Sequence, residues 1–229
     1  MKQQKGATLI IVLVILLMIT ILGTIAVKSG ILGLKIATNS QVNALLLENS
    51  DAALFNVENP AEVEAQLASN GMFAYFDSAD NAGDELVFCY RADKSRFFDL
   101  YDASVISPNG STTKNGITGY CHADRFSTGR SAVVSQVYLT RVTTGSNPLS
   151  NLALGSSAGQ GNIPVISNSI GATVISVLPS FSVASSDEIE KCFKKTRTQV
   201  SECFESLNIP YNMQHADYTV GGSPTLKTS

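Results

Sequence analysis

The hydrophobic pattern is most uneven at the start of the chain, where a short polar head precedes a long apolar run. The head reads MKQQKG and carries two lysines, and residues 7–27 follow without a single charge. As an α-helix rising about 1.5 Å per residue, this run is roughly as long as the hydrocarbon core of a bilayer is thick. The pattern predicts a membrane-spanning helix with its lysines in the cytoplasm, because Lys and Arg bias the orientation of a first segment. We therefore expect everything after Lys28 to lie outside the cytoplasm.

The helical pattern continues beyond the apolar run. Apolar positions recur close to helical spacing between Ile31 and Phe55. Pro60 disfavours the α conformation at Asn59, so the helix is expected to end near Val57. The sequence thus predicts one long helix, of which the first half is apolar throughout.

Short β-rich segments dominate the rest of the chain. A short amphipathic helix is predicted over residues 61–70, ended by Gly71, and residues 143–171 are rich in Gly, Ser and Asn and predict a surface loop. Asn109-Gly110 and Asn115-Gly116 are turn signals, because both residue types tolerate positive φ. Strands are predicted over residues 85–91, 96–101, 103–106, 117–122, 132–142 and 172–183, the last of them interrupted at Pro179. Strands at short spacing with little helix between them predict an antiparallel sheet packed on the long helix, an α+β fold.

A near-repeat lies in the C-terminal third. Residues 187–193 read DEIEKCF and residues 198–204 read TQVSECF, and Ser185 with Glu188 forms a capping-box start. Two geometries are open, one continuous helix or two short helices broken near Thr196, with Thr198 starting the second. We favour the broken form, because the repeat contains its own new cap.

The two geometries imply different disulfides. Four cysteines in a chain placed outside the cytoplasm indicate two disulfide bonds. A continuous helix would separate Cys192 and Cys203 by about 16 Å, so each would bond Cys89 or Cys121 instead. The broken form lets Cys192 pair with Cys203 and leaves Cys89 to pair with Cys121.

Composition bounds the function. A chain of 229 residues is long enough for one domain with a real core in addition to a membrane helix. Without the head's Lys2 and Lys5, the 16 basic residues become 14 against 19 acidic ones, a net charge of −5. This balance argues against a general nucleic-acid surface, which would be basic.

Signals of catalysis or ligand binding are weak. The G-x-S-x-G match at residues 155–159 lacks the preceding strand and following helix that a nucleophile elbow needs. A zinc site at Cys121 and His122 lacks paired C-x-x-C spacing and competes with the disulfides. The acidic residues Asp77, Asp80, Asp84 and Glu85 miss the EF-hand order for calcium, and the basic residues Lys191, Lys194, Lys195 and Arg197 lack interleaved aromatics. We expect no enzymatic activity, no cofactor, no metal site and no direct nucleic-acid binding.

The junction of head and apolar run resembles the leader of a type IV prepilin. The head is short, ends in Gly6 and is followed by ATLI. In that family a membrane peptidase cuts after the glycine and methylates the new amino terminus, so the resemblance implies cleavage between Gly6 and Ala7. Two other interpretations of the apolar run are open. A secretory signal peptide has a shorter apolar core and ends at an A-x-A-like site, which this run lacks, whereas a plain membrane anchor fits its length.

A missing acid refines the resemblance. With Ala7 as the first mature residue, Ile11 takes the fifth position, where major pilins usually carry Glu. A carboxylate in hydrocarbon costs about 3 kcal/mol on insertion scales, so it persists only with a partner. In the family that partner is the methylated amine of the subunit laid down before it. PilX-type minor pilins and K-type pseudopilins of type II secretion both lack the acid, which suits a subunit at the filament tip.

The chain is similar to PilX-type minor pilins over about residues 5–57, and Ala7 rather than Phe as first residue resembles the same type. The resemblance implies a pilin-like α+β protein with a leader (residues 1–6), a transmembrane and amphipathic helix (residues 7–57) and a periplasmic or extracellular head (residues 58–229). It implies a tip or initiation complex that primes pilus growth and supports twitching motility, adhesion and DNA uptake.

The implied partners are other minor pilins, the major pilin, prepilin peptidase, the inner-membrane assembly platform and a PilY-type tip adhesin. The implied location is the bacterial inner membrane, with a periplasmic C-terminus, and after assembly the pilus. Two alternatives remain open. One is a K-type pseudopilin, which usually carries a larger inserted helical domain that the sequence does not reveal, and the other is an uncleaved, anchored periplasmic binding protein.

Overall fold

The computed structural model describes residues 5–94, 99–129, 132–142, 169–219 and 225–226. The chain divides into two compact units, Met1–Val42 and Asn43–Ser229. The first unit is the N-terminal part of one helix. The second unit holds the end of that helix together with a sheet and several short helices, and it is called the head below.

Helix α1 runs from Lys5 to Val57, so its end agrees with the predicted one. Between Leu9 and Ile36 all of its large apolar side chains are exposed. From Leu46 onward the helix turns a buried face to the head, formed by Leu46, Ala53, Leu54 and Val57. The carbonyl oxygen of Val57 accepts a hydrogen bond from the buried Gln66 amide at 2.8 Å, which satisfies one of the helix's terminal acceptors.

The segment after α1 is more divided than predicted. The single helix expected over residues 61–70 is wrong in extent: a 3-10 turn, Pro60–Glu62, leads into α2, Val63–Leu67, and a further helix α3, Met72–Asp77, was not expected. Gly71 lies at the N-cap of α3 and closely against the end of α2. A Cβ atom there would lie 2.1 Å from the carbonyl oxygen of Gln66. The glycine therefore ends one helix and lets the next begin at once. A second 3-10 turn, Ala79–Asn81, follows α3.

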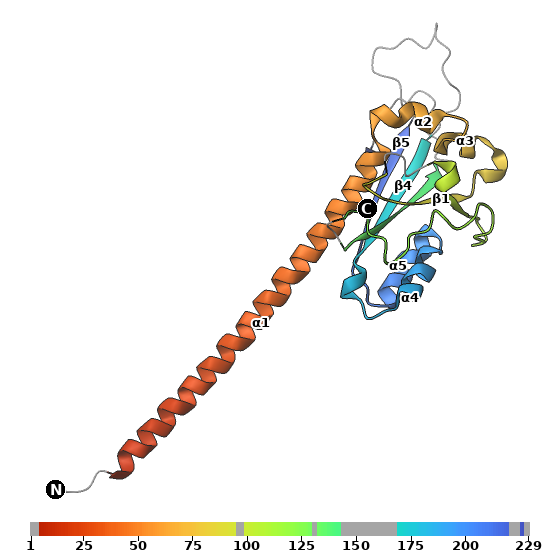
Figure 1. The fold of residues 1–229 in the computed structure, drawn as a ribbon. Helices are drawn as coiled ribbons and strands as arrows, with labels where there is room; N and C mark the ends of the chain where they lie inside the picture. The colour runs from red at the N-terminus through yellow and green to blue at the C-terminus, as the bar shows by residue number, and fades with distance from the viewer. Residues whose placement is uncertain (1–4, 95–98, 130–131, 143–168, 220–224, 227–229) are drawn as a thin grey trace. The chain divides into compact units, whose positions relative to one another are not determined.

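The head is built on an antiparallel sheet (Figure 1). Its described strands are β1 Glu85–Cys89, β2 Ser104–Ile106, β3 Val134–Arg141, β4 Ser169–Val177, β5 Tyr211–Thr219 and β6 Thr225–Leu226. Within the described residues they pair in the order β2-β1-β3-β4-β5-β6, and every pairing is antiparallel. The long strands β3, β4 and β5 form the centre of the sheet. The α+β class and the antiparallel sheet predicted from the sequence are therefore present.

Two helical layers cover the sheet. On one face the end of α1 and α3 pack against side chains that alternate along the strands, including Leu86, Phe88, Val137, Leu139 and Val174. On the other face lie α4, Ser186–Phe193, and α5, Arg197–Ser206. Their buried residues are Ile189, Cys192, Phe193, Val200 and Phe204, and they pack against Val87, Tyr138, Ile175 and Val177. Helices thus cover both faces of the sheet, which explains why β3 and β4 are buried at nearly every position.

Several predicted strands differ from the structure. The strand expected over residues 117–122 is absent: the Gly119 N–H donates to the Ser104 hydroxyl at 2.9 Å and the Cys121 N–H to the Gln136 amide oxygen at 2.9 Å. Side chains, rather than a neighbouring strand, take up the backbone groups there. Strand β4 begins at Ser169, inside the expected loop, and ends at Val177, because Pro179 opens a 3-10 turn, Pro179–Phe181.

Further differences concern the strand expected over residues 96–101, the expected loop and the C-terminal strands. Residues 96–98 of the strand expected over 96–101 lie outside the described residues, and Leu100–Asp102 form a 3-10 turn. Strands β5 and β6 were not expected from the sequence. Residues 143–168 of the expected loop also lie outside the described residues. The two Asn-Gly turns are present, since Gly110 and Gly116 have φ of 81° and 68°.

The C-terminal helices have the broken geometry. The capping box begins α4: the Glu188 N–H donates to the Ser185 hydroxyl, and the Ser185 N–H donates to the Glu188 carboxylate at 2.8 Å. The helix ends at Phe193, and α5 starts at Arg197 with Thr196 as its N-cap, rather than at Thr198. The rings of Phe193 and Phe204 meet edge to face at 5.1 Å, so the break lets both short helices bury their apolar faces.

Gly119 should be intolerant of any side chain. A Cβ atom there would lie 2.2 Å from the Val87 carbonyl oxygen and 2.3 Å from the Ser104 nitrogen, and neither backbone atom can move without disturbing β1 or β2. We expect Gly119→Ala to lower the free energy of unfolding by about 2 kcal/mol or more. The matched control is Gly129→Ala, where a Cβ atom meets nothing within 4 Å. Denaturant unfolding of both variants checks this, and equal stabilities would contradict the packing described at Gly119.

Candidate functional site

Most of the exposed large apolar side chains of the described residues lie in the N-terminal part of α1. Leu9, Ile10 and the large apolar side chains that follow as far as Ile36 are each at least about half exposed. Within the described residues one helix is long and apolar enough to cross a membrane, and its most apolar window has a mean hydropathy of 3.2. A signal sequence near the amino terminus would meet the same criteria. A surface of this kind is stable only against lipid or other apolar helices.

The predicted processing and assembly residues lie in this helix. Gly6 and Ala7 fall in its first described turns, and Ile11 is 57% exposed among other apolar side chains. The first turn of α1 contains no acidic residue. The described part of the apolar segment therefore holds no carboxylate between Lys5 and Val27.

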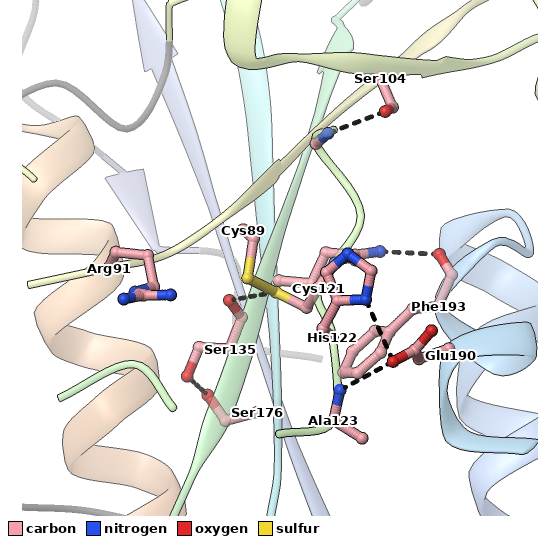
Figure 2. The surroundings of a disulfide bond; sticks show 12 residues. Cys89, Arg91, Ser104, Cys121, His122, Ala123, Ser135, Ser176, Glu190 and Phe193 are labelled. Atoms are coloured by element: carbon pink, nitrogen blue, oxygen red, sulfur yellow. Dashed lines mark hydrogen bonds and ion pairs between the residues drawn. A yellow bond between two sulfur atoms is a disulfide. The ribbon is translucent and has the colours of Figure 1, made fainter. Parts of the chain in front are cut away.

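A second notable region surrounds the disulfide between Cys89 and Cys121 (Figure 2). Cys89 ends β1, and Cys121 lies in the connection from β2 to β3, with a Cα–Cα distance of 4.8 Å. The second disulfide joins Cys192 of α4 to Cys203 of α5 with a Cα–Cα distance of 5.6 Å. These are the two pairs that the broken-helix alternative requires.

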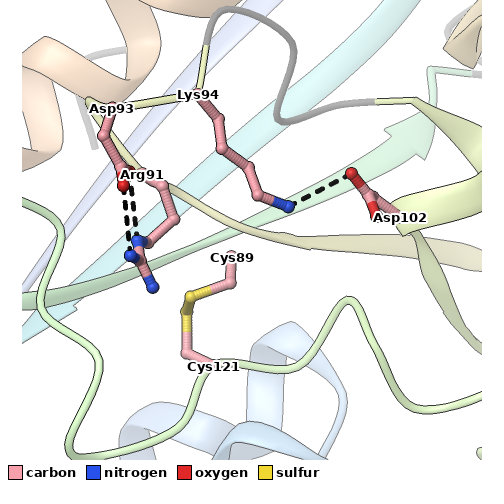
Figure 3. Close-up of polar contacts among 6 residues, drawn as sticks. All are labelled: Cys89, Arg91, Asp93, Lys94, Asp102 and Cys121. Atoms are coloured by element: carbon pink, nitrogen blue, oxygen red, sulfur yellow. Dashed lines mark hydrogen bonds and ion pairs between the residues drawn. A yellow bond between two sulfur atoms is a disulfide. The ribbon is translucent and has the colours of Figure 1, made fainter.

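An open cavity with cationic walls lies beside the first disulfide (Figure 3). Arg91, Lys94 and Arg125 line it together with Tyr120, whose pKa burial raises to about 12, so that its hydroxyl is neutral. Figure 3 shows that two of the three cations are paired: Arg91 with Asp93 at 3.3 Å and Lys94 with Asp102 at 3.2 Å. The Arg91 hydrogen bond lowers the pKa of the Asp93 carboxyl. The cavity is therefore polar, and carboxylates neutralise two of its three cationic groups.

Of the acidic residues considered for calcium, Asp80, Asp84 and Glu85 have described side chains, and these three do not form a metal-binding group. Asp84 is buried, accepts a hydrogen bond from the Tyr75 hydroxyl and forms an ion pair with Lys114. Burial, together with the Asp84 hydrogen bond, raises the pKa of Tyr75. Glu85 accepts the Arg197 backbone N–H at 2.8 Å instead, and Asp80 is exposed. The Asp84 carboxylate thus already has a cationic partner and a donor.

The basic residues of the C-terminal helices likewise do not share one environment. Arg197 lies 3.5 Å from the Glu85 carboxylate, whereas Lys191, Lys194 and Lys195 are exposed. Cys121 cannot act as a zinc ligand while its sulfur is bonded to Cys89. The G-x-S-x-G match at residues 155–159 and the side chain of Asp77 lie outside the described residues.

One cluster was missed from the sequence. His122, next to Cys121, places its Nδ1 atom 3.2 Å from Glu190 Oε1 on α4, and the Ala123 N–H donates to the same oxygen at 3.2 Å (Figure 2). His122 was considered only with the adjacent cysteine. Its partner is 68 residues away in the sequence, and no local spacing points to it.

Comparison of the chain with protein-family models, with curated proteins and with solved structures found no match.

Removing the two disulfides should cost different amounts of stability. They close loops of 32 and 11 residues, and in the chain-entropy description the longer loop restricts the unfolded chain more. We expect the Cys89→Ser/Cys121→Ser variant to lose about 4 kcal/mol of unfolding free energy and the Cys192→Ser/Cys203→Ser variant about 3 kcal/mol. Denaturant unfolding of the full chain in detergent measures both losses.

Non-reducing peptide mapping of the unmodified protein is the control for these variants. It should yield one peptide pair that joins Cys89 to Cys121 and one that joins Cys192 to Cys203. A peptide that joins Cys89 to Cys192 would contradict the pairing.

Proposed function

We propose that the chain is an assembly subunit of a bacterial type IV pilus, a minor pilin of the PilX type. The observation that carries the proposal is a single helix, α1, whose N-terminal part is apolar on all sides and whose end packs on an antiparallel sheet. The prepilin-like leader supports the same conclusion. Cleavage after Gly6 would remove only the leader and leave the apolar helix on the mature protein. The layout of α1 and the head is that expected of a pilin.

The burial pattern of α1 favours a role in assembly over that of a simple anchor. Large apolar side chains continue on the exposed helix surface at Ile31, Leu32, Leu34 and Ile36, beyond the charge-free run and beyond Lys28. An anchor needs only about 20 apolar residues to cross a bilayer. The extra apolar surface fits a helix that packs against the helices of other subunits.

Ile11 supports a place at the filament tip. A subunit with Glu at this position pairs with the amine of the subunit before it, whereas Ile11 offers no charge for that pair. In this proposal the subunit joins other minor pilins in an initiation complex, supports a PilY-type adhesin and is followed by major pilins. It reaches this complex from the inner membrane after prepilin peptidase has cut between Gly6 and Ala7.

Deletion of the coding sequence tests the proposal. We expect surface pili to fall at least tenfold, and blocking retraction should restore only part of them if the subunit primes growth. Complementation with the wild-type chain should restore pili. Complementation with Gly6→Val, which places a β-branched side chain at the cleavage site, should not, and mass spectrometry should find its leader still attached.

Gly23→Ala is the matched control, because a Cβ atom at Gly23 meets nothing within 4 Å and alanine favours a helix. It should complement like the wild type. Unchanged pilus numbers in both retraction backgrounds would contradict the proposal. An intact Met1 on the functional protein would favour an anchored binding protein instead, and a loss of protein secretion without a loss of pili would favour a K-type pseudopilin.

Ile11→Glu should change where the subunit resides. The new carboxylate can pair with the amine of an earlier subunit, so the variant should enter the filament shaft as well as its tip. Labelling of sheared pili with antibodies against the head measures this as label along the filament rather than at one end. Ile11→Leu keeps the apolar character and is the control. If both variants label the tip alone, the carboxylate does not decide the position.

A further inference from the structure

Three side chains with metal-binding atoms meet at the loop that follows Cys121. His122 and Asp124 belong to this loop, and Glu190 reaches it from α4. One ligand atom from each residue lies within 4.8 Å of the others. We propose that His122, Asp124 and Glu190 bind a zinc ion. The proposal concerns the head alone and does not depend on the proposed role in a pilus.

The distances are close to those that zinc requires. Zinc bonds to His nitrogen and carboxylate oxygen are about 2.0–2.2 Å long, so two ligands of a tetrahedral site lie about 3.3 Å apart. His122 Nδ1 and Glu190 Oε1 already lie 3.2 Å apart. The Asp124 ligand atom lies within 4.8 Å of the other two, and its side chain is exposed.

The two sides of the site are held in place by the fold. Cys121 is fixed by its disulfide and by a hydrogen bond from its N–H to Gln136, and Ala123 is buried. Glu190 lies two residues before Cys192, whose disulfide ties α4 to α5. The Ala123 N–H also holds Glu190 Oε1 at the mouth of the loop. Ligands on such fixed segments lose little conformational entropy when they bind a metal.

The ligand types select the metal. One imidazole and two carboxylates suit zinc, whereas calcium prefers six to eight oxygen ligands. Three protein ligands leave the fourth zinc position to water. Because the site joins the loop at residues 122–124 to α4, zinc should hold these two segments together and stabilise the folded head.

Isothermal titration of the full-length protein, in detergent and without a histidine tag, tests the site. We expect one zinc ion per chain and no calcium binding in the same range. His122→Asn and Glu190→Gln should each weaken zinc binding at least tenfold, since each removes one ligand. Glu190→Gln keeps an oxygen that can accept the Ala123 N–H, so its effect is on the metal rather than on the loop.

His215→Asn is the matched control. His215 also faces a carboxylate, with its Nε2 atom 3.1 Å from Asp217 Oδ1, but it lies on β5 in a different part of the head. Zinc binding should survive in this variant, and zinc should raise the melting temperature of the control but not of the His122 variant. If His122→Asn fails to fold, Asp124→Asn at an exposed position takes its place. No zinc binding by the wild type, or equal binding by the ligand variants, would overturn the proposal.

Discussion

The head depends on one buried amide, that of Gln136 near the start of β3. Its oxygen accepts the Cys121 N–H at 2.9 Å, and its nitrogen donates to the Phe193 carbonyl at 2.7 Å and to the Tyr138 hydroxyl at 2.6 Å. All of these groups are buried, so any one left without its partner would cost about 1–3 kcal/mol. The amide thereby ties the sheet to the loop that holds Cys121 and to the end of α4. Gln136 thus binds a cysteine of the first disulfide directly, Cys121, and it binds Phe193, the neighbour of Cys192 in the second disulfide.

The opposite face of the sheet is joined to α1 in a different way. Its contacts are mostly apolar, with Ala53, Leu54 and Val57 packed against the strands. Polar links also run from Ser50 to Ser176 and on to Ser135 at 2.8 and 2.7 Å, and from Asn56 to Tyr90. Apolar packing is less directional than hydrogen bonding. The other face differs in that it carries two covalent cross-links, Cys89–Cys121 and Cys192–Cys203.

The sequence pattern predicted features that depend on local signals and missed those that depend on contacts between distant residues. The end of α1, the capping box at Ser185, the break near Thr196 and the Asn-Gly turns all rest on local signals, and the structure contains them. Strand β5 was missed although local stop signals precede it: Asn208, with a φ of 52°, and Pro210 lie between the end of α5 and Tyr211. The segment at residues 117–122 looked like a strand, but its backbone bonds go to Ser104 and Gln136, which no local pattern reveals. The pairing of His122 with Glu190 was missed for the same reason.

In α1, the residues that pack into the head are separate from the exposed apolar residues of its N-terminal part. In the proposed function, this separation matters because the helix lies first in lipid and then among other subunits. The apolar cluster of the head includes residues of α1 only from Ala52 onward, and none of Leu9–Ile36 contributes to it. The core of the head is thus complete whichever apolar surroundings cover the N-terminal part of the helix. In the proposed function this lets the subunit fold on the periplasmic side while it is held in the bilayer. The same folded head then persists when the helix leaves the lipid and packs among other subunits, because no contact within its core has to be exchanged.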